Sequence, residues 1–146
     1  MSGHFRKNED PVFFVLHDGT KQGYLYPHSE DWEIIPAINV EEGDRFISKT
    51  ANDEFYNTTF KADLQKLGIT ELVITGCATD FCVDATIKLA LANDFNLTII
   101  SDAHTTADRP NLSAKQIIDY FNWMWYEMIP TKGNIKVVSF EEYLTT

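Results

Sequence analysis

Long apolar runs and an excess of basic residues are both missing from this sequence of 146 residues. No apolar run approaches the roughly 18 residues that a membrane-spanning helix needs. The N-terminal segment MSGHFRKNED lacks the apolar core of a signal peptide, so we expect a cytoplasmic protein. Lys and Arg total 12 against 22 Asp and Glu, and the net charge of −10 argues against binding nucleic acid or an anionic membrane through a basic face.

Cysteine is scarce as well, with Cys77 and Cys82 as the two residues of this type. Two cysteines do not provide the disulfide framework of a small secreted protein. Without nearby histidines they supply too few ligands for zinc, and their C-x4-C spacing differs from the C-x-x-C of thioredoxin-like proteins. We expect two free thiols, with a disulfide between them as the alternative, and neither a metal nor a cofactor.

Apolar residues are plentiful, at 44% of the chain with 13% aromatic, which indicates one packed domain over residues 1–146. Short apolar segments alternate with segments of helical period, and this alternation predicts βαβ units and a parallel sheet in an α/β protein. We expect strands within residues 11–16, 44–50, 72–75, 96–100 and 135–140. Helices are expected near residues 61–67, after Phe81, and after a capping box at Ser113 and Gln116.

The most informative stretch surrounds Cys82, where a strand, a tight turn and a helix are expected in succession. Residues 72–75 suit a buried strand, and residues 76–80 are mostly small or polar. Apolar side chains then recur at helical spacing, at Val83, Ile87, Ala90 and Leu91. Cys82 is therefore expected in the first turn of a helix, where unpaired N–H groups and the helix dipole favour the nucleophilic thiolate. The alternative is a buried cysteine that packs as a small hydrophobe.

Residues 76–86, GCATDFCVDAT, closely resemble the nucleophile turn of the isochorismatase-like cysteine hydrolases, a family that includes the nicotinamidases. The resemblance extends from about Pro11 to the C-terminus. It implies a Rossmann-like three-layer α/β/α fold whose mostly parallel sheet has the strand order 3-2-1-4-5-6. It also implies a hydrolase that cleaves an amide-like or related C–N or C–O bond of a small molecule through the Cys82 thiolate. The N–H groups of Ala78 and Cys82 would form the oxyanion hole, with a cis peptide bond between Cys77 and Ala78.

Lys49 is the second catalytic residue that the resemblance implies. A lone lysine is usually solvated, but Lys49 ends an expected strand and precedes an aromatic–Thr segment, as the catalytic Lys of the resembled family does. Its ammonium would hold the thiolate and orient the substrate carbonyl. Nicotinamidases bind zinc through an Asp and two closely spaced His, whereas His17 and His28 are eleven residues apart, so no metal is expected.

Five residues are candidates for the substrate pocket because they follow strands or lie in adjoining loops. Ligands of open α/β sheets bind at the carboxyl ends of the strands. Each candidate also has a simpler interpretation: a strand-end residue can belong to a turn, and a loop aromatic can pack beneath its own loop. The candidates are His17, Trp32, Phe55, Tyr56 and Thr79.

One part of the family pattern has no counterpart here. Members begin with an additional strand that ends in the catalytic Asp, the general base, whereas residues 11–16 match the family's second strand. We therefore expect the first strand, near the middle of the sheet, to be missing, with backbone groups left unpaired beside residues 12–16 and 72–75. Asp18 is the nearest available carboxylate. The alternative function is accordingly a catalytically impaired member that serves as a binding or assembly subunit.

Trp123 lies off the apolar stripe of the helix expected after Gln116. Exposed aromatic residues often mark contacts between proteins. We expect a homo-oligomer, in addition to a small-molecule substrate, as the binding partners of this chain.

Overall fold

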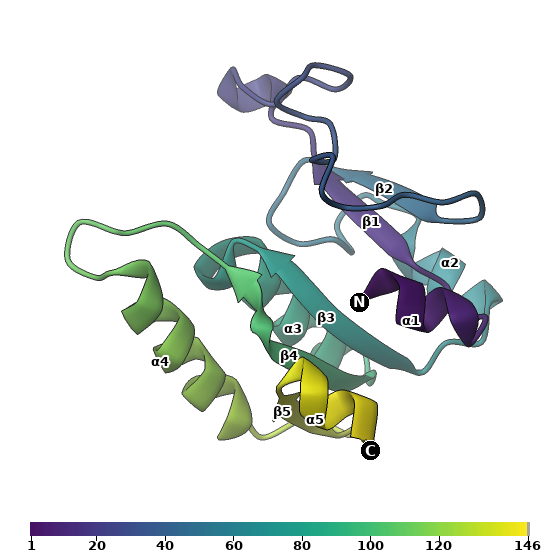
Figure 1. Cartoon of the computed structure of the whole chain (residues 1–146), viewed down its shortest axis with the longest axis vertical. Helices are drawn as coiled ribbons and strands as arrows, with labels where there is room; N and C mark the ends of the chain where they lie inside the picture. Colours follow the sequence, from purple (N-terminus) through teal and green to yellow (C-terminus); the bar gives the residue numbers. More distant parts are fainter. Residues whose placement is uncertain (146) are drawn as a thin grey trace. The chain divides into compact units, whose positions relative to one another are not determined.

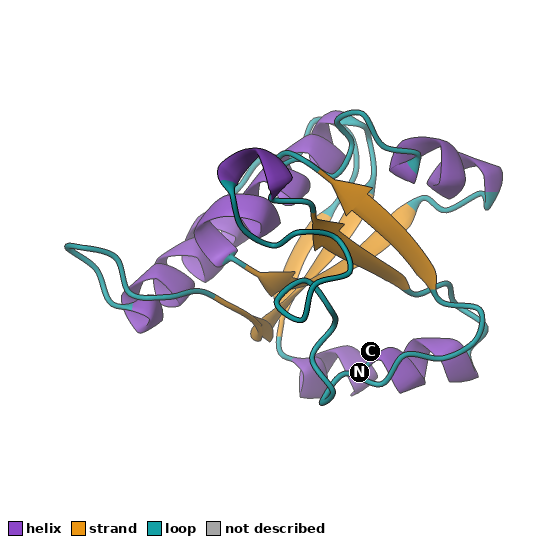
Figure 2. Ribbon diagram, turned by 90° about the horizontal axis from the view of Figure 1, so that it is seen from above, coloured by secondary structure: helices purple, strands orange, loops and turns teal. Residues whose placement is uncertain are grey.

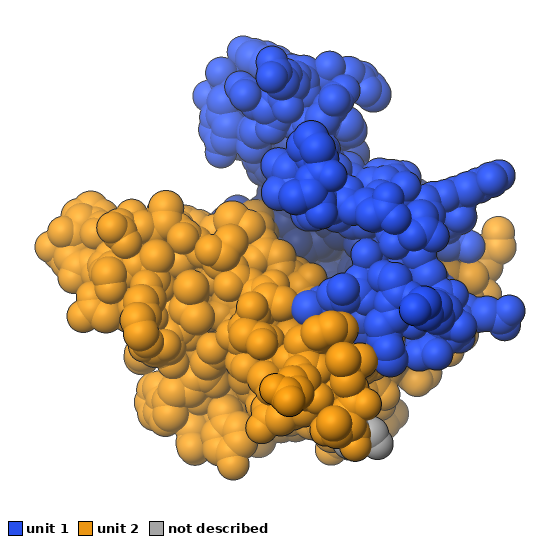
Figure 3. All heavy atoms as spheres, viewed as in Figure 1, with its two compact units in different colours: residues 1–60 blue, residues 61–146 orange. Residues whose placement is uncertain are grey.

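The computed structural model describes residues 1–145 and has an α/β fold in which parallel sheets are flanked by helices (Figures 1 and 2). The chain divides into two compact units, residues 1–60 and residues 61–146 (Figure 3). The first unit contains α1 (Ser2–Lys7), β1 (Phe13–His17), the 3-10 turn η1 (Thr20–Gln22) and β2 (Arg45–Lys49). Helix α2 (Phe60–Lys66) begins at the last residue of the first unit.

The first unit is built on a two-stranded parallel sheet. Its register pairs Phe13 with Arg45 and His17 with Lys49, so both strands end at the same edge. The rings of Phe13 and Phe60 meet edge to face, with their centroids 5.4 Å apart. This contact packs apolar side chains against the start of β1 and leaves His17 and Lys49 at the other end.

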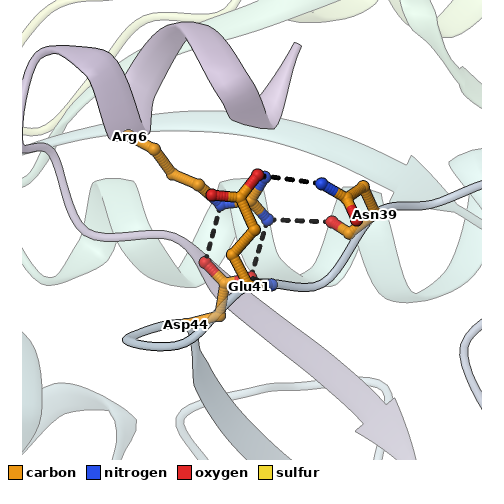
Figure 4. A network of polar contacts seen from close by, with 4 residues as sticks. All are labelled: Arg6, Asn39, Glu41 and Asp44. Atoms are coloured by element: carbon orange, nitrogen blue, oxygen red, sulfur yellow. Dashed lines mark hydrogen bonds and ion pairs between the residues drawn. The ribbon is translucent and has the colours of Figure 1, made fainter.

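Arg6 on α1 holds the segment that leads into β2 (Figure 4). Its guanidinium donates to both carboxylate oxygens of Asp44, at 2.9 and 2.6 Å, and to Glu41 at 3.0 Å. It also donates to the carbonyl of Asn39 at 2.9 Å. Bidentate pairs of this kind add directional restraint to charge attraction, so they help to fix the start of β2.

The second unit contains a three-stranded parallel sheet of order β3-β4-β5, formed by β3 (Glu71–Cys77), β4 (Asn96–Thr105) and β5 (Ile135–Val138). Helices α3 (Asp84–Ala92) and α4 (Ala114–Tyr126) connect successive strands and lie on one face, and α5 (Phe140–Thr145) lies on the other (Figures 1 and 2). Because β4 is central and covered on both faces, residues 97–100 are all buried.

Two elements next to Cys82 differ from the expectation drawn from the sequence. The expected helix is an α-helix only from Asp84, because Thr79–Val83 form a π-helical turn, η2. Strand β4 continues past residue 100 to Thr105, because a register shift lets residues 74–76 of β3 face residues 99–104 of β4. Both departures lie at the carboxyl end of β3, where the nucleophile was expected.

Strands β1 and β3 each pair with a single neighbour among the residues that the structure describes. Each therefore has one edge without a strand partner in the described part of the chain. No helix within residues 1–145 is both long and apolar enough to cross a membrane.

The exposed surface of α4 carries Trp123, the aromatic residue that the sequence placed off the apolar stripe of this helix. The capping box of Ser113 and Gln116 is present and starts the helix. Trp123 is 58% exposed, beside Tyr120 and Tyr126 at 55% and 70%. The homo-oligomer itself stays a prediction.

Candidate active site

The backbone at the end of β3 has an unusual local geometry. Gly76 has a φ of 132°, a conformation that residues with a Cβ rarely adopt. The peptide bond between Cys77 and Ala78 is cis, and Ala78 is extended, with φ −97° and ψ 142°. The chain therefore turns abruptly from the strand into η2.

Cys82 lies within η2, close to the end of this turn. The carbonyl of Ala78 accepts the N–H groups of Phe81 and Val83, each at 3.1 Å, and the second bond spans five residues. The carbonyl of Cys82 accepts the hydroxyl of Thr86 at 2.6 Å. Short π-helical turns frequently occur at functional sites. Here the turn leaves Cys82 half-buried rather than enclosed in the core.

The two thiols differ in their surroundings. Partial desolvation raises the pKa of Cys77, and the charges of Cys82 and Asp80 raise it further, while Arg109 opposes them. Cys77 is therefore held as a thiol, the weaker nucleophile of the two protonation states. This favours Cys82 over Cys77 as the reactive residue. Neither Cys77 nor Cys82 takes part in a disulfide bond within the described residues.

A buried network supports the turn from inside. The hydroxyl of Thr79 lies 2.9 Å from Nδ1 of His104, and Nε2 of His104 lies 2.9 Å from Oδ1 of Asn122. The amide of Asn122 donates to the carbonyl of Ser101 at 3.0 Å, so its oxygen faces His104. His104 therefore carries its proton on Nε2 and accepts from Thr79. Burial lowers the pKa of His104, which keeps the ring neutral.

A charged network supports the turn from the loop after β4. Asp80 accepts two bonds from Arg109, at 2.7 and 2.9 Å, and one from the hydroxyl of Thr106 at 2.6 Å. The hydrogen bonds from Arg109 and Thr106 lower the pKa of Asp80 to about 2. The guanidinium of Arg109 also lies 4.8 Å from the centroid of the Phe81 ring. Asp80 is therefore ionised at neutral pH and anchors the turn.

Lys49 lies in the first unit, at the end of β2. It is 4% exposed, and its Nζ donates to Oε1 of Glu54 at 2.6 Å and to the carbonyl of Asn52 at 2.9 Å. Burial raises the pKa of Glu54, and the charge of Lys49 opposes that rise. The Oε2 atom of Glu54 is buried without a hydrogen-bond partner among the described residues. Lys49 thus has a carboxylate partner that the sequence analysis did not single out.

Asp18 serves as a turn residue in the first unit. Its carboxylate accepts the backbone N–H of Thr20 at 2.9 Å, and its hydrogen bonds with the side chain and the backbone of Thr20 lower its pKa. A carboxylate with a lowered pKa is a weaker base, so Asp18 is poorly suited to replace the family's catalytic Asp.

The other pocket candidates of the first unit have different environments. Nδ1 of His17 and Nε1 of Trp32 are buried and lack partners within the described part of the chain. Phe55 packs against Phe60, with ring centroids 5.2 Å apart, whereas Tyr56 is 57% exposed. An open hollow of about 530 Å³ on this unit contains none of these candidates and is lined by Phe46, Ile47, Ser48, Asn57, Thr58 and Thr59.

Within the second unit, the structure brings Ala78, Thr79 and Cys82 onto one turn. Thr79 is fully buried and supports the turn through His104. His104 and Arg109 were not predicted as site residues from the sequence, although both closely follow the apolar run of β4. Lys49 and His17 are paired at the edge of the first unit's sheet where β1 and β2 end.

No cluster of three or more His, Cys, Asp or Glu side chains able to hold a metal ion occurs in residues 1–145.

The chain belongs to the isochorismatase family, because the Isochorismatase domain matches residues 3–128. A solved structure of an isochorismatase family protein superimposes with a TM-score of 0.85 at 28% identity, covering 94% of this chain and 78% of that one. The fold is therefore that of the isochorismatase-like hydrolases.

Three curated relatives indicate the range of this family. The chain is 31% identical over 99 residues to a streptothricin hydrolase of Streptomyces noursei (68% of this chain, 39% of the relative). It is 31% identical over 112 residues to a ureidoacrylate amidohydrolase of Methylorubrum extorquens (75% and 45%). It is 32% identical over 123 residues to a probable inactive nicotinamidase of Arabidopsis thaliana (82% and 62%). The chain thus spans less than two thirds of the length of each.

Proposed function

We propose that this chain is a cysteine hydrolase that cleaves an amide-like or related C–N or C–O bond of a small molecule, with Cys82 as the nucleophile. The observation that carries the proposal is the position of Cys82 on a π-helical turn held by two separate networks. Rigid support of this kind is what a positioned nucleophile needs. Membership of a family with hydrolase and amidohydrolase relatives supports the reaction class.

The proposed reaction on an amide has two stages. The Cys82 thiolate attacks the carbonyl carbon, a C–S bond forms, and the carbonyl oxygen becomes an oxyanion that accepts the N–H groups of Ala78 and Cys82. The C–N bond then breaks, the nitrogen takes a proton from solvent and leaves as an amine, and a thioester remains. Water attacks the thioester, the C–S bond breaks, the acid and the Cys82 thiolate are released, and one proton returns to solvent. Lys49 would supply positive charge to the substrate carbonyl, as the resemblance implies.

A catalytically impaired subunit is the second candidate function. Asp18 and Glu54 are poor candidates for the family's general base, because Asp18 is engaged by Thr20 and Glu54 by Lys49. One relative is itself a probable inactive nicotinamidase. Such a protein would retain the fold and the turn without turnover.

Turnover and thiol labelling together separate these functions. The full chain would be assayed for release of ammonia or amine from a panel of small amides that includes ureidoacrylate and streptothricin. We expect Cys82→Ser to lose roughly 10³-fold or more in turnover, and the matched variant Cys77→Ser to keep it. A Cys82→Ser variant with the parent's rate would exclude the mechanism. If no amide is cleaved and Cys82 reacts with iodoacetamide no faster than Cys77, the impaired subunit is the correct function.

A further inference from the structure

Arg109 holds both residues that immediately precede Cys82. Its Nε donates to Oδ2 of Asp80 at 2.7 Å, and its Nη2 donates to Oδ1 at 2.9 Å, so the carboxylate is bound through both oxygens. The same guanidinium lies over the ring of Phe81, 4.8 Å from its centroid. One side chain from the loop after β4 therefore restrains two consecutive residues of η2.

Arg109 is itself restrained from two directions. The hydroxyl of Thr106 accepts from Nη2 of Arg109 at 2.9 Å and donates to Asp80 at 2.6 Å, which closes a three-membered network. The backbone of Arg109 exchanges hydrogen bonds with Leu112, at 2.8 and 3.3 Å. The side chain of Arg109 is thus held against the turn, and its main chain is held within its own loop.

We propose that Arg109 is a positioning residue for Cys82: it keeps η2 in the geometry in which the sulfur of Cys82 reacts, and it compensates the charge of Asp80. The proposal rests on the function proposed above, in which Cys82 is the nucleophile. An uncompensated carboxylate two residues from a cysteine disfavours a thiolate. A released Asp80–Phe81 segment would also let the sulfur leave its reactive orientation.

The effect of these charges is visible at the neighbouring thiol. The charge of Asp80 raises the pKa of Cys77, and the charge of Arg109 lowers it. Desolvation and the charge of Cys82 raise this pKa as well, so removal of Arg109 would take away the one contribution that lowers it. The network therefore acts on the electrostatics of the turn as well as on its shape.

A positioning role and a purely structural role predict opposite changes in thiol labelling. If Arg109 only stabilised the fold, its loss would loosen the turn and make Cys82 more accessible, so that alkylation would become faster. If Arg109 positions Cys82, its loss makes the accessible sulfur less reactive, so that alkylation becomes slower. The sign of the change is therefore informative even before a substrate is known.

The experiment uses the full chain with Cys77→Ser, which leaves Cys82 as its single thiol. The second-order rate of alkylation by iodoacetamide is followed at pH 7 by intact-protein mass spectrometry. We expect Arg109→Gln to react about tenfold more slowly, and Arg109→Lys, which keeps the charge without the bidentate geometry, to recover part of the rate. The matched control is Lys115→Gln, which removes an exposed ion pair with Asp119 and should keep the parent rate.

An Arg109→Gln protein that reacts as fast as the parent, or faster, would overturn the proposal. If Arg109→Gln does not fold, Thr106→Val decides instead. This variant removes the hydrogen bonds of Thr106 to Asp80 and to Arg109, and it should slow alkylation of Cys82 about threefold. An unchanged rate overturns the proposal. The alkylation rate of the parent unfolded in urea provides the reference for a cysteine thiol without a folded environment. A folded parent no faster than that reference refutes Cys82 as the nucleophile, whereas a fast parent with an unaffected Arg109→Gln refutes the role of Arg109 alone.

Discussion

Lys49 and Glu54 form an ion pair that is almost completely removed from solvent, with Nζ 2.6 Å from Oε1 and the two side chains 3% and 8% exposed. The Nζ atom also donates to the carbonyl of Asn52, whereas Oε2 of Glu54 lacks a partner in the described chain. Both charges have lost their hydration, so each depends on the other for compensation.

Removal of one partner should therefore be costly. Glu54→Ala leaves the Lys49 ammonium buried without a counter-charge, and we expect the free energy of unfolding to fall by about 3 kcal/mol. Urea denaturation at pH 7 measures this loss. Asp119→Ala breaks the exposed pair with Lys115 and should cost less than about 1 kcal/mol. Equal losses of unfolding free energy in Glu54→Ala and Asp119→Ala would contradict the burial of the ion pair between Lys49 and Glu54.

The raised pKa of Glu54 gives stability a distinct pH dependence. Because burial lifts this pKa above its usual 4.5, the folded state binds the proton more tightly than the unfolded state does. Its stabilising contribution is complete below pH 4.5 and is lost as the pH rises through the raised pKa. Relative to Glu54→Gln, the parent should lose unfolding free energy as the pH rises above 4.5 and through the raised pKa. A constant difference between parent and variant would show that Glu54 titrates normally.

Asp80 should show the opposite dependence. Arg109 and Thr106 lower its pKa from 3.8 to about 2, so its contribution is present above 3.8 and is lost as the pH falls towards 2. Since the side chain remains 15% exposed, we expect a contribution on the order of 1 kcal/mol after solvent screening. Unfolding curves of the parent and Asp80→Asn should therefore converge as the pH falls. Curves that keep the same separation at low pH would refute the anchoring role of Asp80.

The bond between Thr79 and His104 can be tested by substitution and by NMR. Thr79→Val removes the donor and leaves Nδ1 of His104 unsatisfied in the core, so we expect a loss of about 1–3 kcal/mol. Thr79→Ser keeps the hydroxyl and should recover most of that loss. Nitrogen chemical shifts should show a neutral ring protonated on Nε2 at pH 7. A ring protonated on Nδ1 would contradict the network.

Local sequence patterns predicted much of the fold. The apolar segments around residues 11–16, 72–75 and 96–100 coincide with β1, β3 and β4, because short continuous apolar runs favour the strands of a parallel sheet. The capping box of Ser113 and Gln116 predicted the start of α4, because its bonds join residues three apart. The family match around Cys82 also came from contiguous residues.

Two contacts near the candidate site depend on residues brought together by folding. The bond between Thr79 and His104 joins positions 25 residues apart, and that between Asp80 and Arg109 joins positions 29 apart. The register of β3 and β4, which pairs Gly76 with His104, brings these two stretches together, and no local pattern encodes it.

The sequence by itself determined the α/β class, the family and the identity of the candidate nucleophile, because short-range periodicity and contiguous motifs carry that information. The tertiary structure alone decided that Cys82 lies on a π-helical turn, that Arg109 and His104 support that turn, and that Glu54 is buried against Lys49. The physical reason is that burial and long-range pairing depend on how strands align and what covers them.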